Sequence, residues 1–347
     1  MSFEYATAID RGTRKRERGG INEDSISAVI IEGGHQDVTQ SLGAFVLADG
    51  AGGEDAGEVA SHLAARVVGR ELSDLLWEAC YPREFDSPAS EGEPDIQGET
   101  ILNAITRAIQ EAHRRILETV SDLDLGGAYT TIVVGVKAAD RMYYAWVGDS
   151  RAYVINTHPE CPRSESISAL TRDHSLVRRL VDRGSIDEVE AHVHRQGNRV
   201  TRALGGTPED EPGASQIQVD TGEIRLHGDD IVLLTSDGLI DAYADAPRLH
   251  DEYRKATDPT HVEEKILRHA VTDDEIRDVV LNAGCLDEAA TALVSLANDR
   301  GGKDNISIIL YRDGELPSSP AQRYGDRNEE ADVSPANATT ALRRDDD

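Results

Sequence analysis

The chain has 347 residues, which is enough for one large domain or for two domains of ordinary size. Its 65 acidic and 36 basic residues give a net charge of −29 at pH 7. This charge repels phosphate backbones and anionic lipid headgroups, so we expect neither a nucleic-acid partner nor a membrane partner.

Short segments rich in β-branched and apolar residues predict strands. In chain order they are residues 25–31, 43–49, 129–136, 141–149, 230–237 and 305–311. Between the second and third of these strands, apolar residues recur at helical spacing over 59–76 and again over 101–120. The strands at 129–136 and 141–149 are joined too tightly for a crossover helix and must be antiparallel. These elements predict a layered α+β fold with helices packed outside the sheets.

Two segments differ in composition from the rest. Residues 82–98 are acidic and rich in proline, and residues 315–347 carry too few apolar side chains to form a core. We predict a disordered loop insertion at 82–98 and a disordered acidic tail at 315–347. The folded domain would then span residues 1–314.

The expected location is cytoplasmic. The first twenty residues, MSFEYATAIDRGTRKRERGG, lack the apolar centre of a signal peptide, and no segment approaches the ~18 apolar residues of a membrane span. The three cysteines show no paired spacing, so neither a disulfide framework nor a zinc ribbon is expected. We expect a monomer. The acid excess and the five lysines are halophile-like and predict greater stability in molar KCl than in dilute buffer.

Acidic side chains stand at the ends of several predicted strands. They are Asp49, Asp149 and Asp237 at three strand ends, Asp304 just before the last strand, and Glu23 and Asp24 just before the first. A single Asp-Gly pair is usually only a turn, but a repeated one favours a common site. Converging buried carboxylates repel one another and lose hydration, and a hard divalent cation removes both penalties. Oxygen ligands without His or Cys favour Mg²⁺ or Mn²⁺ over zinc.

Eight motifs in sequence order resemble the metal-dependent protein phosphatases of the PPM family, also called protein phosphatase type 2C, in the bacterial and archaeal style. The motifs are NED (22–24), FVLADGAGGEDAGEVAS (45–61), GAYTTIVV (127–134), VGDSRAY (147–153), LTRDHSLVRRLVDRGSI (170–186), NRVTRALGG (198–206), GDDIVLLTSDGLID (228–241) and GKDNISIIL (302–310). The resemblance covers nearly all of the domain at 1–314. It implies a four-layer α-β-β-α sandwich with two antiparallel sheets flanked by helix pairs, and a flap at 171–206.

The resemblance also implies a set of site residues. Asp49 would bridge two Mg²⁺ or Mn²⁺ ions, and Gly50 would offer its carbonyl to one of them. Asp237 and Asp304 would complete the coordination of the other ion. Glu23 and Asp24 would hold metal-bound waters and act with Asp49 in catalysis. Asp149, together with Asp237, would support a third and weaker ion.

The implied activity is that of a serine/threonine protein phosphatase. A metal-bridging hydroxide would attack the phosphorus of phosphoserine or phosphothreonine in a protein substrate, and a cognate Ser/Thr kinase pathway would supply that substrate. The sequence contains no CxxxxxR phosphate loop and no GxxxxGK[ST] loop. Two alternatives stay open, namely a catalytically weak regulator or adaptor of the same fold and a phosphoesterase acting on small molecules.

Three features bear on the finer details. The family's phosphate-binding arginine lies four residues before the glutamate of the first motif, where this chain has Gly19, so we assign the role to Arg18. The histidine that follows the bridging Asp-Gly in eukaryotic members is Ala51 here. His192 and His194 alternate in a segment rich in Glu and Arg, and we interpret them as solvated rather than as a pair of metal ligands.

Overall fold

The computed structural model describes residues 3–35, 38–52, 56–81, 98–207, 216–241, 243 and 245–319. The predicted loop insertion at 82–98 lies outside these residues except for Gly98, which begins a helix. The predicted tail lies outside them from residue 320 onward.

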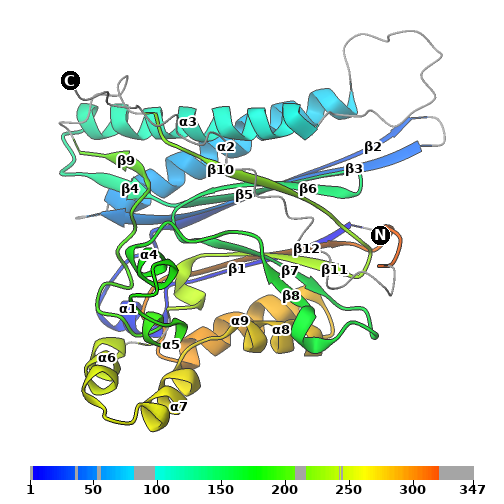
Figure 1. Cartoon of the computed structure of the whole chain (residues 1–347). Coiled ribbons are helices and arrows are strands. Elements are labelled where there is room, and N and C mark those ends of the chain that lie inside the picture. The colour runs from blue at the N-terminus through cyan, green and yellow to red at the C-terminus, as the bar shows by residue number, and fades with distance from the viewer. Residues whose placement is uncertain are drawn as a thin grey trace, which may run out of the picture.

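Two antiparallel sheets are stacked face to face at the centre of the molecule (Figure 1). The seven-stranded sheet has the order β10 (Asp220–Arg225), β6 (Arg141–Val147), β5 (Ile132–Ala138), β3 (Val38–Gly52), β4 (Ala128–Thr130) and β9 (Leu204–Gly206), and β2 (Asp24–His35) also pairs with β3. The five-stranded sheet has the order β1 (Phe3–Asp10), β12 (Ile306–Asp313), β11 (Asp230–Thr235), β7 (Arg151–Asn156) and β8 (Ile167–Ala169). The predicted hairpin is confirmed, because β5 and β6 pair antiparallel.

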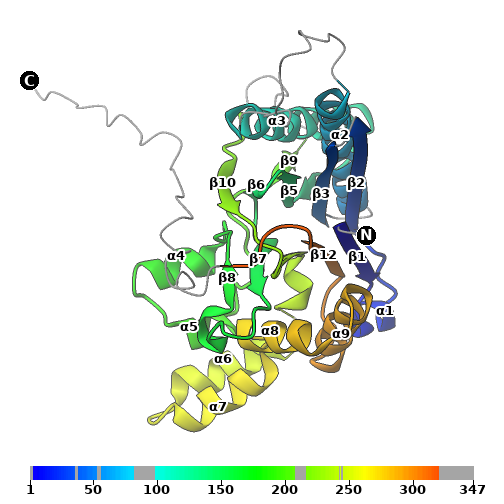
Figure 2. The same cartoon turned by 90° about the vertical axis from the view of Figure 1, so that its right-hand side faces the viewer.

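Helices cover both outer faces of this pair of sheets. Helices α2 (Ala56–Cys80) and α3 (Gly98–Asp122) lie on the seven-stranded sheet, whereas α8 (Asp273–Asn282) and α9 (Leu286–Asp299) lie on the five-stranded sheet (Figures 1 and 2). The four-layer α-β-β-α fold is therefore confirmed. The predicted apolar stripe of α3 is buried throughout. On α2 the buried stripe is rotated in its first half, where Ala60 and Ala64 face inward.

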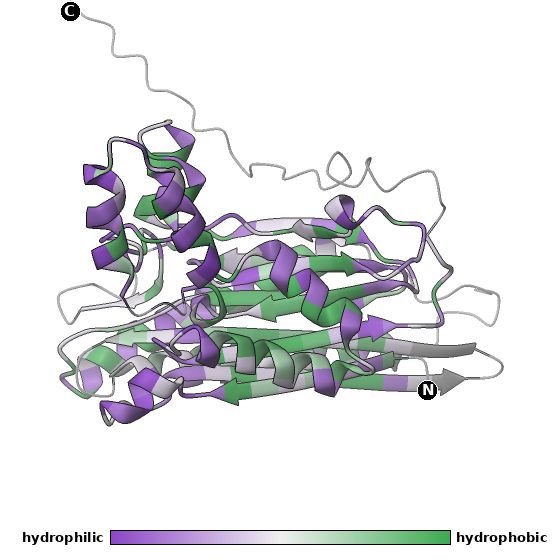
Figure 3. Ribbon diagram, turned by 90° about the horizontal axis from the view of Figure 1, so that it is seen from below, coloured by the Kyte–Doolittle hydropathy of each residue, from purple (hydrophilic) through white to green (hydrophobic). Residues whose placement is uncertain are grey.

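Three apolar layers hold the sandwich together. One lies between the sheets, where the rings of Phe45 and Tyr311 stack with centroids 4.3 Å apart beside the buried Trp146. The other two lie between each sheet and its helices. Figure 3 shows the apolar colouring concentrated on the strands and the polar colouring on the outward parts of the helices. Burial of these faces is the main stabilising force.

The short helices gather at one end of the sandwich (Figure 1). They are α1 (Thr13–Glu17), α4 (Leu176–Asp182), α5 (Glu188–Ala191), α6 (Ala246–Lys255) and α7 (Thr260–His269). Helices α4 and α5 belong to the predicted flap at 171–206. Helices α6 to α9 were not predicted from the sequence.

The boundary of the predicted tail needs correction. Residues 315–319 pack on the turn before β11, where the Gly228 N–H donates to the Pro317 carbonyl at 3.0 Å and the Ser319 N–H donates to Asp229 Oδ2 at 2.8 Å. Ser319 itself is buried. Pairing with the turn satisfies polar groups of both segments, which composition alone does not predict.

Within the described ranges, every helix is too short or too polar to cross a membrane.

A buried ion pair joins the two sheets. Lys137 of β5 places its Nζ 2.5 Å from Asp313 Oδ2 of β12, and the two side chains are 5% and 8% exposed. The Lys137 ammonium group also donates to the Ser41 carbonyl at 3.1 Å. Removing one member of such a pair leaves the other charge buried without compensation.

We therefore expect Lys137→Met to lower the free energy of unfolding by about 3–5 kcal/mol. Urea unfolding of the two proteins measures this difference. The matched control is Lys255→Met at an exposed position of α6, which should change stability by less than about 0.5 kcal/mol. Equal stabilities of the two methionine variants would show that the ion pair does not join the sheets energetically.

Candidate metal centre

The first pair of acidic residues comes from the seven-stranded sheet. The register of β2 and β3 sets Asp24, the first residue of β2, directly opposite Asp49, which lies three residues before the end of β3. The backbone around Asp49 is fixed, because its carbonyl accepts the Thr131 N–H at 2.8 Å. The Gly50 N–H donates to the Glu23 carbonyl at 3.1 Å. Glu23, Asp24, Asp49 and Gly50 therefore lie side by side.

The second pair comes from the five-stranded sheet. Asp237 follows β11, and Asp304 precedes β12, which pairs with β11. A side chain on Gly238 would meet the Asn305 carbonyl at 1.8 Å, so only glycine allows the two turns to pack this closely. The carbonyl of Asp304 likewise lies against Gly12, whose φ of 74° favours glycine.

The acids of the two sheets lie close enough for their charges to interact. Burial raises the pKa of Asp49 well above its ordinary value, and the negative charges of Asp24, Asp237, Asp304 and Asp149 raise it further. Burial likewise raises the pKa of Asp237, to which Asp149 and Asp304 add. Acids from the ends of both sheets thus repel one another at one end of the sandwich.

The donor set fits a hard divalent cation. Asp24 is 8% exposed, and among the described residues its Oδ1 atom has no hydrogen-bond partner. Its Oδ2 atom accepts a hydrogen bond from the Ser236 hydroxyl at 3.0 Å. Burial raises the pKa of Asp24 to about 6. A buried carboxylate oxygen without a partner, among four other acids, is a site that a cation would stabilise, and oxygen ligands suit Mg²⁺ or Mn²⁺.

Asp149 lies next to this group, in the turn after β6. It is 7% exposed, and burial together with the charges of Asp173 and Asp241 raises its pKa to about 7. Burial also raises the pKa of Asp241, which the sequence analysis did not single out although it ends the TSDGLID motif. Asp149 and Asp241 extend the acidic site toward the flap.

A lysine, rather than the predicted arginine, faces the acids from helix α1. Lys15 Nζ donates to Glu23 Oε2 at 2.9 Å, to Asp304 Oδ1 at 2.7 Å and to Asn305 Oδ1 at 2.8 Å. Burial alone would lower the pKa of Lys15, but these bonds to Asp304 and Glu23 outweigh it and raise the pKa. Lys15 is therefore charged at neutral pH.

Arg18 lies away from the acids. It is exposed at the end of α1, and the described part of the chain offers its side chain no ion pair or hydrogen bond. Its neighbours also face elsewhere, since Arg14 lies 3.7 Å from Asp245 and Arg16 lies 2.6 Å from Asp10. Four residues more than the family spacing separate Lys15 from Glu23, and α1 and the turn after it accommodate them. This placement weighs against Arg18 as the phosphate-binding residue.

Asn305 connects the two halves of the site. Its Oδ1 atom accepts the Glu23 N–H at 2.8 Å, and its amide donates to the Arg11 and Ile21 carbonyls at 3.3 and 3.2 Å. Asn305 follows Asp304 in the motif GKDN, but its hydrogen bonds to distant backbone groups could not be predicted from the sequence.

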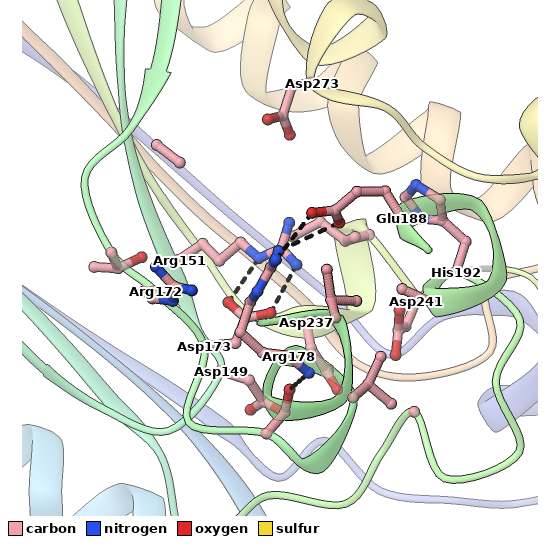
Figure 4. Close-up of a pocket in the computed structure, with 18 of the residues that line it drawn as sticks. Asp149, Arg151, Arg172, Asp173, Arg178, Glu188, His192, Asp237, Asp241 and Asp273 are labelled. Atoms are coloured by element: carbon pink, nitrogen blue, oxygen red, sulfur yellow. Dashed lines mark hydrogen bonds and ion pairs between the residues drawn. The ribbon is translucent and has the colours of Figure 1, made fainter. Parts of the chain in front are cut away.

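A pocket of about 890 Å³ opens beside the acids (Figure 4). Asp149, Asp237 and Asp241 line one part of it, and the flap lines another. The arginines of the pocket are paired with acids. Arg151 binds both carboxylate oxygens of Asp173 at 2.9 and 2.7 Å, and Arg178 binds Glu188 at 2.9 and 3.2 Å. The pocket is thus polar, and it leads from solvent to the acids.

Comparisons with known proteins agree with this geometry. A family model described as "Protein phosphatase 2C" matches residues 11–273. The "Serine/threonine phosphatase stp" of Listeria innocua serovar 6a is 30% identical over 314 residues, which are 89% of this chain and 95% of that protein. The "Protein phosphatase PhpP" of Streptococcus pneumoniae is 28% identical over 269 residues, which are 77% of this chain and 84% of that protein.

Solved structures show the same fold. The serine/threonine phosphatase PstP/Ppp of Mycobacterium tuberculosis aligns with a TM-score of 0.60 and 25% identity, over 90% of this chain and 99% of that one. The catalytic domain of PstP in complex with two manganese ions aligns with a TM-score of 0.58 and 25% identity, over 90% of this chain and 98% of that one.

The raised acid pKa values predict how the metal-free protein responds to pH. An acid with a raised pKa in the folded state binds more protons there than in the unfolded chain, so stability falls as pH rises from about 4 to about 7. Asp149→Asn cannot ionise and should remove part of this fall, on the scale of ~1.4 kcal/mol per pKa unit.

The measurement is urea unfolding in chelator at pH 5 and pH 8. Asp74→Asn, on an exposed position of α2, is the control for the loss of one negative charge. Identical pH responses of the two asparagine variants would contradict the electrostatic account.

Proposed function

The chain belongs to the protein phosphatase 2C family, and on that basis we propose that it is a metal-dependent serine/threonine protein phosphatase. Its substrates would be proteins phosphorylated by a Ser/Thr kinase. The observation that carries the proposal is the convergence of Asp24, Asp49, Asp237 and Asp304 at one end of the sandwich, with raised pKa values for the first three. The full acid set favours an enzyme over the regulator or adaptor.

Each residue of the acidic centre would have a separate role. Asp49 would hold two ions, Mg²⁺ or Mn²⁺, with the Gly50 carbonyl on one side and Asp237 and Asp304 on the other. Two such ions would supply a shared water acidic enough, with a pKa lowered from ~15.7 toward ~7, to attack phosphorus as hydroxide. Glu23 and Asp24 would accept hydrogen bonds from waters at the site. Asp149 would support a third ion with Asp237.

Lys15 would bind the phosphoryl group. Its ammonium group lies within 2.9 Å of Glu23 and Asp304, so it stands at the edge of the acid cluster and would face a phosphate bound beside these acids. A phosphate carries negative charge into a strongly acidic site, and a fixed cation offsets that repulsion. Lysine binds phosphate as a point charge, without the bidentate fork of arginine.

The pocket beside the acids would receive the protein substrate. It lies between Asp149 and the flap, and its paired arginines leave it without a strong positive field. Such a pocket fits residues that flank the phosphorylated side chain better than it fits a second phosphate.

Hydrolysis of a phosphothreonine peptide with Mn²⁺ tests the proposed activity. Asp49→Asn should abolish turnover, because a neutral amide cannot offset two dications, and chelation of the wild-type protein should do the same. Asp74→Asn should retain full activity as the charge-matched control. Activity that survives both chelation and Asp49→Asn would overturn the metal mechanism, whereas an inactive wild-type protein would favour the regulator or adaptor.

Paired variants of helix α1 test the assignment of the phosphate-binding residue. We expect Lys15→Ala to raise KM for the phosphopeptide about 10- to 150-fold, which corresponds to the loss of ~1.5–3 kcal/mol from a charge-assisted hydrogen bond. Lys15→Arg should restore most of the affinity, and Arg18→Ala should behave like the wild type. A KM defect in Arg18→Ala but not in Lys15→Ala would return the role to Arg18.

A further inference from the structure

A second group of metal-ligating side chains lies outside the acidic centre. Glu190 of α5, His194 in the turn after α5 and His250 of α6 each offer one ligand atom, and these atoms lie within 4.8 Å of one another. His250 Nε2 lies 3.1 Å from Glu190 Oε1. The His194 and His250 rings meet edge to face with centroids 4.9 Å apart. Three segments thus bring two imidazoles and one carboxylate to a single point.

The charge of Glu190 requires compensation there. The residue is 4% exposed, and a buried carboxylate without a cation is costly. Arg254 Nε lies 3.6 Å away, but the Arg254 side chain is 60% exposed and samples solvent. His250 Nδ1 is buried and has no hydrogen-bond partner among the described residues. His250 therefore contacts Glu190 through one ring nitrogen, while no described group satisfies its other, buried ring nitrogen.

We propose that Glu190, His194 and His250 form a zinc site that ties the flap to helix α6. Two imidazole nitrogens and one carboxylate oxygen are a typical set of three protein ligands for Zn²⁺, with water in the fourth position. Bonds of ~2.1 Å place neighbouring ligands of a tetrahedral ion ~3.4 Å apart, which is close to the 3.1 Å between His250 and Glu190. The set is softer than the all-oxygen centre, so the two sites select different ions.

The local backbone supports this arrangement. Glu190 and His194 are four residues apart, and the turn bonds from Val193 N to the Glu190 carbonyl and from His194 N to the Ala191 carbonyl keep the chain coiled between them. This spacing sets both side chains on one side of the turn. His192 and His194 were interpreted from the sequence as solvated, but both are partly buried, and the ring of His194 meets that of His250.

The surroundings hold the ligands in place. Helix α6 is docked on the flap by an apolar cluster that includes Val193, Leu249 and Ile266. The Tyr253 hydroxyl donates to Asp187 Oδ2 at 2.7 Å. An ion bound at a preformed contact loses little to reorganisation and adds its binding free energy to the docking of the flap. The flap borders the pocket, so zinc would restrain the wall of the pocket without entering the acidic centre.

Zinc binding by the full chain in excess Mg²⁺ tests the proposal, because Mg²⁺ occupies the oxygen ligands of the acidic centre. We expect one Zn²⁺ per chain by equilibrium dialysis, and binding at least tenfold weaker in His250→Gln and in His194→Gln. His261→Gln, at an exposed position of α7, is the matched control and should bind like the wild type. Zinc should also raise the unfolding temperature of the wild type but not that of the two site variants.

Two further measurements distinguish loss of the zinc site from loss of folding and from effects at the acidic centre. Circular dichroism without zinc shows whether a variant is folded, and His194→Gln is the milder change because His194 is partly exposed. Zinc binding that persists in Asp49→Asn would separate this site from the acidic centre, and thus from the proposed phosphatase activity. Absence of zinc binding to the wild type in Mg²⁺, or equal binding by folded His194→Gln, would overturn the proposal.

Discussion

Mutual repulsion of carboxylates at one end of the sandwich is the constraint on which the rest of this structure depends. Asp24 and Asp49 pair on neighbouring strands of one sheet, and Asp237 and Asp304 flank strands of the other. Burial and mutual repulsion raise the pKa values of Asp24, Asp49 and Asp237, so the protein alone does not neutralise these three acids. A cation would offset this repulsion, so bound ions and the folded arrangement of the acids would stabilise one another.

The layered fold explains why the acids meet at all. Each sheet is held flat against the other by apolar residues, and this packing brings the strand ends to the same place. Gly238 lets the turn after β11 lie on Asn305, and Asn305 in turn holds Glu23 and Lys15. The rigid core therefore positions the ligands, while the short helices α4 to α7 lie at the same end of the sandwich.

The sequence made it possible to single out acids that the fold brings together, but not the lysine that faces them. Asp49 and Asp237 follow long apolar runs, so a strand end and a turn are visible in the sequence itself. Lys15 was missed because counting back from Glu23 assumes a fixed number of residues between the glutamate and its cationic neighbour. Helix α1 and the turn after it add residues to that segment. Strand β7 and helices α6 to α9 were missed because their burial depends on contacts made far along the chain. Glu190 and His250 meet only through such a contact.

Diffraction from crystals grown with Mn²⁺, recorded at the manganese absorption edge, tests the central claim most directly. Anomalous density locates manganese without assumptions about the ligands. The account predicts two strong peaks that share Asp49, one of them beside the Gly50 carbonyl and the other beside Asp237 and Asp304. Density absent from these carboxylates, in crystals where the strand ends are ordered, would contradict it.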